Sequence, residues 1–120
     1  MLEIGITYQD PDLILYTHLH PDHTADLVPT LFACKYGDLQ REKDLLCIGG
    51  SGFKSFFEKL EELYGSWIKP QSYHLTVKEI SKEAMLYRDL KIFSKPMAHI
   101  SGSVGYRIEF KDGKSIAISG

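Results

Sequence analysis

Thr17-His18-Leu19-His20-Pro21-Asp22-His23 is the part of this chain that most constrains its structure and chemistry. It brings three of the five histidines and a carboxylate into a short run that directly follows the apolar residues 13–16. Imidazole and carboxylate groups are the ligands that suit Zn²⁺ and similar divalent ions. The stretch therefore predicts a metal site at the end of a buried strand.

The spacing of the histidines predicts how they would share the ions. In a regular strand, His18 and His20 lie on one face, so two imidazoles can bind the same ion. Pro21 then turns the chain, so that Asp22 and His23 can reach a neighbouring position. Two adjacent ions are typical of hydrolases in which the metals polarise the scissile bond and produce a hydroxide near neutral pH. Two simpler interpretations stay open: Asp22 caps the following helix, or a histidine packs in the core.

Strand and helix patterns alternate through the first half of the chain. Residues 13–17 and 45–48 have the short apolar pattern of buried strands. Pro29 interrupts a helical spacing of apolar residues, so we expect a kink, or a short turn followed by a helix that restarts near Val28. Residues 36–44 are polar and indicate a loop.

The pattern changes from helical to alternating after Pro70. Before it, residues 53–64 have the apolar spacing of an amphipathic helix, and Gly65 is well placed to end that helix. After it, Asp112-Gly113 is a hairpin signal between two strands. The expected strands beyond Pro70 are residues 73–77, 90–93, 104–110 and 115–118. The pattern predicts an α/β domain whose later strands are antiparallel.

Composition places the chain among ordinary globular proteins. Its 120 residues are 43% hydrophobic and 25% charged, which fits one domain, and residues 1–120 show no repeat or linker. No apolar run is long enough to span a membrane and no signal peptide is visible, so no membrane partner is expected. Cys34 and Cys47 lack a CxxC spacing and indicate buried thiols in a reducing compartment, which favours the cytoplasm.

The charge is unevenly distributed along the chain. The net charge is −2, which excludes a strongly basic nucleic-acid-binding protein. Residues 1–68 have a balance of −6, whereas residues 69–120 have a balance of +4. A solvated surface with scattered charges accounts for this difference. The alternative is a basic face that attracts phosphate towards a metal centre.

The motif at residues 17–23 resembles the HxHxDH signature of the metallo-β-lactamase superfamily, and more narrowly that of ribonuclease Z-like enzymes. Three further stretches are similar to this family. Residues 49–52 resemble its glycine turn before a helix, residues 96–107 its third histidine segment, and residues 116–120 the strand leading to its bridging aspartate. The resemblance implies a partial αββα sandwich, with a mixed sheet and helices on one face.

The resemblance also implies roles for individual residues. His18, His20 and His99 would bind one metal, and Asp22 and His23 would bind the other. Asp22 would also orient the nucleophilic water. The implied cofactor is Zn²⁺, two ions per complete site, with Mn²⁺ or Fe²⁺ as alternatives. Because the bridging aspartate, a final histidine and a first hairpin have no counterpart within residues 1–120, we expect an incomplete domain.

The resemblance implies a metal-dependent hydrolase, and two substrate classes remain. We favour a phosphodiesterase or nuclease that uses metal-bound hydroxide on RNA or a cyclic nucleotide. No long tRNA-gripping arm is visible, so a general phosphodiesterase fits better than a dedicated tRNA nuclease. The alternative is hydrolysis of a thioester, lactone or lactam, because the fold does not choose the substrate.

A third hypothesis belongs to another class of protein. The chain could be a non-catalytic metal-binding fragment that needs strands from a partner, because unprotected sheet edges are expected at both ends. A homodimer is a further expectation.

Several residues outside the motif are weaker candidates. Ser101 and Tyr106 would contact a substrate phosphate through their hydroxyl groups. The turn at residues 49–52 could bind phosphate at a helix N-terminus, but it lacks the Gly-Lys-Ser/Thr ending of a P-loop, so a tight strand-to-helix turn fits better. His74 lies opposite its apolar neighbours and is expected on the surface.

Overall fold

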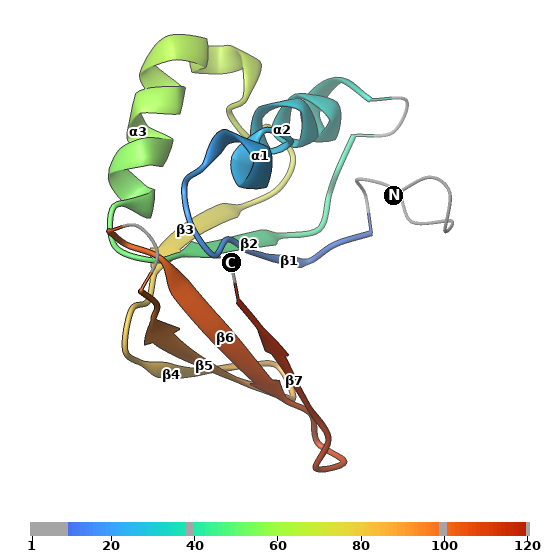
Figure 1. Ribbon diagram of the computed structural model, residues 1–120. Coiled ribbons are helices and arrows are strands. Elements are labelled where there is room, and N and C mark those ends of the chain that lie inside the picture. The colour runs from blue at the N-terminus through green and yellow to red at the C-terminus, as the bar shows by residue number, and fades with distance from the viewer. Residues whose placement is uncertain (1–9, 38–39, 99–100, 120) are drawn as a thin grey trace.

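The computed structural model describes residues 10–37, 40–98 and 101–119. Within them, the strands form a three-stranded parallel sheet and a four-stranded antiparallel sheet. The helices cover one face of the parallel sheet, and the antiparallel sheet lies against its other face (Figure 1). The arrangement is therefore three layers, in the order helices, parallel sheet, antiparallel sheet. None of the helices in these described ranges is long and apolar enough to cross a membrane.

The parallel sheet is built from strands that alternate with helices. Its order is β1-β2-β3, and both pairs are parallel. The strands are β1 (Leu13–Leu15), β2 (Leu45–Gly49) and β3 (Leu75–Glu79). The connecting helices are α1 (Pro21–Thr24), α2 (Leu27–Tyr36) and α3 (Phe53–Tyr64), followed by the 3₁₀ turn η2 (Gly65–Trp67). Parallel strands need such crossovers, because a tight turn joins only antiparallel neighbours.

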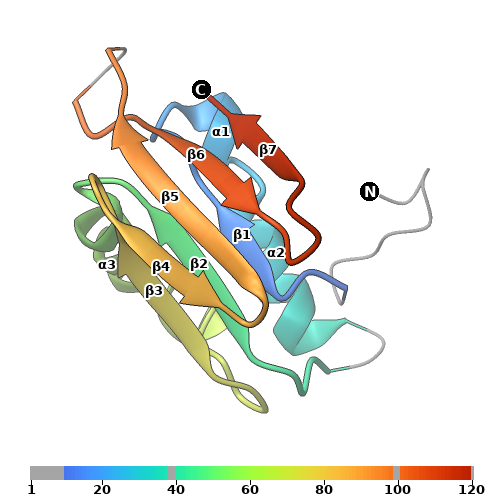
Figure 2. The ribbon, with the colours of Figure 1, turned by 90° about the horizontal axis from the view of Figure 1, so that it is seen from below.

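The antiparallel sheet is a meander that follows β3. Its order is β4-β5-β6-β7, so each strand pairs with the one before it (Figure 2). The strands are β4 (Ala84–Tyr87), β5 (Leu90–Pro96), β6 (Val104–Glu109) and β7 (Ser115–Ile118). The hairpin between β6 and β7 turns at Gly113, whose φ of 91° is a left-handed conformation that glycine adopts without strain.

The central strand β2 separates two hydrophobic cores. Leu45 and Cys47 belong to the cluster under the helices, whereas Leu46 and Ile48 belong to the cluster between the sheets. Successive side chains of a strand point to opposite faces, so an unbroken apolar run can fill both clusters. This explains why residues 45–48 are continuously apolar instead of alternating.

The two sheets are joined by polar contacts at the end of β1. The Tyr106 hydroxyl on β6 donates to the carbonyl oxygen of Tyr16 at 2.7 Å. The backbone N–H of Val104 donates to the carbonyl oxygen of Thr17 at 2.8 Å. Burial raises the pKa of the Tyr106 phenol well above its ordinary value, so this donor stays protonated. These contacts fix the chain immediately before His18.

The expected fold class is confirmed, with three local differences. The parallel and antiparallel strands are divided between two sheets instead of sharing one mixed sheet. Strand β4 and turn η2 were not expected, since Ala84–Tyr87 is short and gives little periodic signal. The helix restarts near Val28 as predicted, and Pro29 does not kink it. Pro29 lies in the first turn of α2, where a backbone N–H has no helical partner to lose.

The contact between Tyr106 and Tyr16 predicts a measurable loss of stability. Tyr106→Phe should lower the free energy of unfolding by about 1–2 kcal/mol in urea titrations, because a buried carbonyl loses its donor. Tyr64→Phe is the matched control, because Tyr64 is 38% exposed and its variant should stay within about 0.5 kcal/mol of the parent. Equal losses in both variants would contradict the sheet-joining role of Tyr106.

The two cysteines provide a second prediction, on chemical reactivity. Both are thiols and each is 1% exposed, and burial raises the pKa of Cys47 from 9.0 to about 12. At about pH 8 both should react slowly with a disulfide reagent in the native chain and rapidly in urea. As the pH rises from 9.0 towards 12, the Cys47 thiol ionises in the unfolded chain before it does so in the folded chain. The free energy of unfolding should therefore fall over this range. Rapid native labelling would contradict this burial.

Candidate metal centre

The histidine motif lies in the loop between β1 and α1 instead of on a strand. Strand β1 ends at Leu15, and α1 begins at Pro21 with His20 at its N-cap. The expectation that His18 and His20 share one face of a regular strand is therefore wrong. The physical reason is that the Thr17 carbonyl bonds to Val104 of the other sheet, so the chain leaves the β1–β2 pairing before it reaches the motif.

The loop nevertheless brings the three histidines together. The ring centroids of His18 and His20 are 4.7 Å apart with nearly perpendicular planes, and those of His18 and His23 are 4.0 Å apart. The turn is closed by the backbone N–H of His23, which donates to the carbonyl of His20 at 2.9 Å. Pro21 at the first helical position favours this abrupt start, because its φ already suits a helix.

His18 is the central and most buried member of this histidine group. It is 3% exposed, and its Nδ1 lies 2.9 Å from the hydroxyl oxygen of Thr17. When Nδ1–H donates to Thr17, the lone pair of the imidazole is on Nε2, the nitrogen that a metal ion would use. Thr17 thus orients the ring of His18 through Nδ1, on the side of the ring away from Nε2. The spacing of the motif alone does not reveal this interaction.

Asp22 and His23 form the exposed side of the group. The Asp22 Oδ2 atom is 3.4 Å from Nε2 of His23, and their side chains are 78% and 44% exposed. The structure does not support the alternative that Asp22 caps a helix. His20 is the N-cap residue of α1, and Asp22 lies inside its first turn. Its carboxylate is therefore open to water and to a bound ligand.

The donor types fit a divalent ion. Three imidazoles and a carboxylate are borderline to hard donors, which suit Zn²⁺, Mn²⁺ or Fe²⁺. His18 lies against His20 and His23, and Asp22 lies against His23. Across residues 10–37, 40–98 and 101–119, no three His, Cys, Asp or Glu side chains converge closely enough to hold an ion. The expected third ligand of the first ion, His99, lies outside the described residues.

The connection between β5 and β6 begins and ends beside the motif. Its base is closed by the backbone N–H of Met97, which donates to the carbonyl of Ser103 at 2.9 Å. The next residue, Val104, makes the bond to Thr17 described above. The fold therefore anchors the described ends of this connection next to the residue that orients His18.

The two expected substrate-binding hydroxyls have different outcomes. Tyr106 is 2% exposed and its hydroxyl donates to a backbone carbonyl inside the core, which corrects the expectation that it contacts a substrate. Ser101 is exposed on the turn before β6, where its role stays a prediction. The expected surface position of His74 is confirmed, with a side chain that is 91% exposed.

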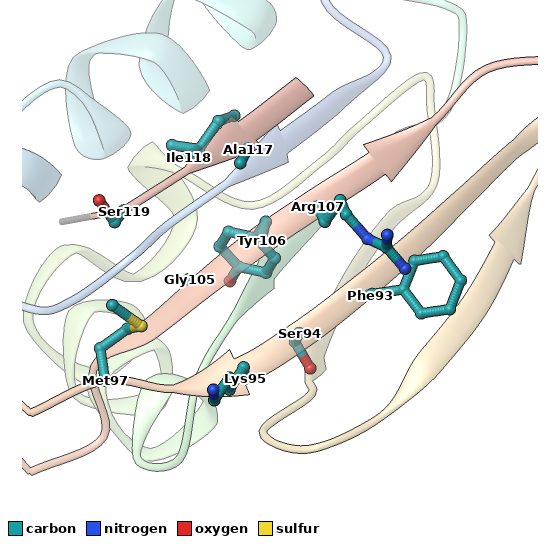
Figure 3. Close-up of a pocket in the computed structure, with 10 residues that line it drawn as sticks. All are labelled: Phe93, Ser94, Lys95, Met97, Gly105, Tyr106, Arg107, Ala117, Ile118 and Ser119. Atoms are coloured by element: carbon teal, nitrogen blue, oxygen red, sulfur yellow. The ribbon is translucent and has the colours of Figure 1, made fainter. Parts of the chain in front are cut away.

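A separate cavity lies on the outer face of the antiparallel sheet (Figure 3). It has a volume of about 410 Å³ and is lined by residues of β5, β6 and β7 with Met97 at one end. The Arg107 guanidinium lies over the ring of Phe93, with its central carbon 4.6 Å from the ring centroid. Among the described residues, those that line this cavity include no histidine and no carboxylate.

Comparison with solved structures identifies the class of fold. A metallo-β-lactamase fold protein from Bacillus subtilis matches with a TM-score of 0.70 and 19% identity, over 97% of this chain and 43% of that one. The short form of human tRNase Z matches with a TM-score of 0.74 and 19% identity, over 97% and 51%. A subclass B3 metallo-β-lactamase from a soil metagenome matches with a TM-score of 0.56 and 18% identity, over 97% and 43%.

These likenesses show that the chain has the metallo-β-lactamase fold, as the motif predicted. The chain spans about half the length of these solved structures. No protein-family model and no curated protein matches the sequence. At these identities the comparisons establish the fold, and the chemistry has to be argued from the site itself.

The central position of His18 predicts how zinc binding responds to substitution. His18→Ala should weaken Zn²⁺ binding by at least about tenfold in calorimetric titrations, because it removes the imidazole that contacts both His20 and His23. His74→Ala is the control and should bind as the parent does, since His74 lies on the opposite end of the parallel sheet's strands. Equal affinities for both variants would show that the motif is not the metal site.

Proposed function

We propose that this chain contributes the first half of the metal centre of a metal-dependent hydrolase that cleaves phosphodiesters. The observation that carries the proposal is the contact of three imidazoles and one exposed carboxylate in a metallo-β-lactamase fold. Bound divalent ions would polarise the scissile bond and lower the pKa of a water molecule. The chain's own residues hold the ions and orient that water.

Each side chain of the motif has a distinct part in this proposal. His18 and His20, joined by His99, would hold one ion, and Asp22 and His23 would hold the second. The Asp22 carboxylate is 78% exposed, so it can accept a hydrogen bond from the attacking water and orient it. Thr17 keeps the ring of His18 in place through Nδ1. The ligand set and the role of Asp22 are those that the family resemblance implies, and the exposure of Asp22 supports its proposed role.

Two observations favour a phosphodiester as the substrate. One of the solved structures with this fold is described as a tRNase, and its match has a TM-score of 0.74. Residues 69–120, which include β3 and the whole antiparallel sheet, have a charge balance of +4 that would attract phosphate. RNA and cyclic nucleotides are the proposed substrates, and the cytoplasm, where thiols such as Cys47 stay reduced, is the proposed location.

Other chemistry in the same fold is the main competing proposal. A subclass B3 metallo-β-lactamase shares the arrangement, with a TM-score of 0.56. Hydrolysis of a thioester, lactone or lactam would use the same donors, because it also needs a polarised bond and an activated water. The two classes differ in the charge of the group that is attacked. A phosphodiester is negatively charged, whereas a thioester, lactone or lactam group is neutral.

The fragment hypothesis is supported by the outer strand of the antiparallel sheet. Among the described strands β7 lies at an edge of its sheet, and its Ile116 and Ile118 are 51% and 41% exposed. Exposed isoleucines on an edge strand favour pairing with a further strand. In that case the chain would bind metal but require a partner, or a second copy of itself, for turnover.

The deciding experiment measures turnover in the metal-loaded chain. Purified protein with added Zn²⁺ or Mn²⁺ should hydrolyse bis(p-nitrophenyl) phosphate and short RNA in preference to a thioester, a lactone and a lactam. Asp22→Asn should lower kcat by at least about 100-fold while the ion at His18 and His20 stays bound, because an amide is a weaker ligand for the second ion and orients water poorly. His74→Ala should retain parental activity.

Three outcomes of this experiment separate the proposals. Preferred turnover of an uncharged ester or amide would favour the competing substrate class. Bound zinc without turnover, together with oligomers in size-exclusion chromatography, would favour the fragment hypothesis. Unchanged turnover in Asp22→Asn would remove the carboxylate from the mechanism.

A further inference from the structure

Two glycine-containing turns from distant parts of the chain lie backbone against backbone. Gly50 belongs to the turn between β2 and α3, and Gly102 belongs to the connection between β5 and β6. A Cβ atom on Gly50 would lie well under 3.0 Å from the carbonyl oxygen of Gly102. A Cβ atom on Gly102 would lie equally close to the carbonyl oxygen of Ser51. Both obstructing atoms are backbone atoms, which cannot rotate away as a side chain would.

The two glycines are required for different reasons. Gly102 has a φ of 86°, a conformation that side chains rarely adopt, and it also lacks space for a Cβ. Gly50 is buried, and at this position the obstacle is space alone. Gly113 provides a natural comparison. Its φ of 91° is similar to that of Gly102, but nothing lies within 4 Å of its Cβ position.

The turn between β2 and α3 also lies close to the histidine motif and to the residue that bonds to it. The Cβ position of Gly52 is 4.0 Å from Cδ1 of Leu19, which lies between His18 and His20 in the sequence. The Cβ position of Gly50 is 3.0 Å from Cγ1 of Val104, whose backbone N–H bonds to Thr17. A shift of either turn would therefore reach the loop that carries the histidines.

The glycine turn at residues 49–52 packs against the connection between β5 and β6. Sequence alone left open whether residues 49–52 bind phosphate. The carbonyl oxygen of Gly102 lies next to Gly50, and its negative partial charge disfavours an anion beside that residue. The backbone N–H of Phe53 is also engaged, because it donates to the carbonyl of Gly50 at 3.1 Å.

We propose that Gly50 and Gly102 are positioning residues for the candidate metal centre. Their backbone contact holds the start of β6 against Thr17, and Thr17 in turn orients the imidazole of His18 through its hydroxyl. The pathway from the glycines to the metal ligand passes through Val104 and consists of two hydrogen bonds. The link to the metal rests on the function proposed above, whereas the contact between the turns does not.

The first test of this proposal needs no metal. Amide hydrogen exchange measured by NMR should show faster exchange at Val104 and Met97, by at least about tenfold, in Gly50→Ala and in Gly102→Ala. The amide of Tyr16, which bonds to Ile48 within the parallel sheet at 2.8 Å, should keep its protection. Gly113→Ala is the matched control for Gly102→Ala, because it introduces the same unfavourable φ without a clash.

The second test measures zinc affinity in the same variants. Gly102→Ala should bind Zn²⁺ at least about fivefold more weakly than Gly113→Ala, because only the former displaces Thr17 and His18. If Gly102 has a purely structural role, Gly102→Ala and Gly113→Ala should both have a lower Tm but the same affinity for zinc. If Gly50→Ala does not fold, both tests can be made with Gly102→Ala alone, because Gly102 lies on a half-buried turn.

The outcomes distinguish this inference from the proposed function. Unchanged exchange at Val104 in the glycine variants would overturn the contact between the turns. Faster exchange with zinc affinity equal to that of Gly113→Ala would overturn the positioning role. Absence of zinc binding in the parent chain would reject the proposed function, and the exchange data would still decide whether the two turns hold each other.

Discussion

The carbonyl oxygens of Tyr16 and Thr17 are the points on which the rest of this structure depends. At the end of β1 they accept hydrogen bonds from Tyr106 and Val104 of the other sheet. A buried carbonyl without a donor costs free energy, so the crossing of the two sheets is fixed where these bonds form. Strand β1 ends at the same place, and the loop that carries the histidines follows it. Sheet packing and the candidate metal centre are therefore consequences of one set of contacts.

The two hydrophobic cores explain why a chain of 120 residues can hold such a site in place. Strand β2 supplies side chains to both cores, and the helices and the antiparallel sheet each cover one of its faces. The histidine loop follows β1, whose half-buried side chains pack against both cores. Such anchoring restricts the loop and lowers the entropy cost of gathering ligands. The close approach of Gly50 and Gly102 adds a second constraint, which reaches the same loop through Val104 and Thr17.

Much of the architecture could be predicted from the sequence, because local patterns dominate it. The apolar run at 45–48 and the amphipathic spacing at 53–64 indicated their elements correctly, and Asp112-Gly113 marked the last hairpin. Strand β4 was missed because its four residues are all apolar and too few to show an alternating period. The division of the strands between two sheets was missed for a different reason: the pairing partners of a strand are set by contacts distant in sequence, which periodicity does not encode.

The sequence by itself determined the family resemblance and the donor set, because His18, His20, Asp22 and His23 are specified by their order alone. Only the tertiary structure decided how those donors are presented. It placed His18 in the interior and Asp22 at the surface, although the two residues are four positions apart. It also moved Tyr106 from an expected substrate contact to a bond between the sheets. Burial and long-range hydrogen bonds depend on which segments pack together, and a linear pattern of residue types does not contain that information.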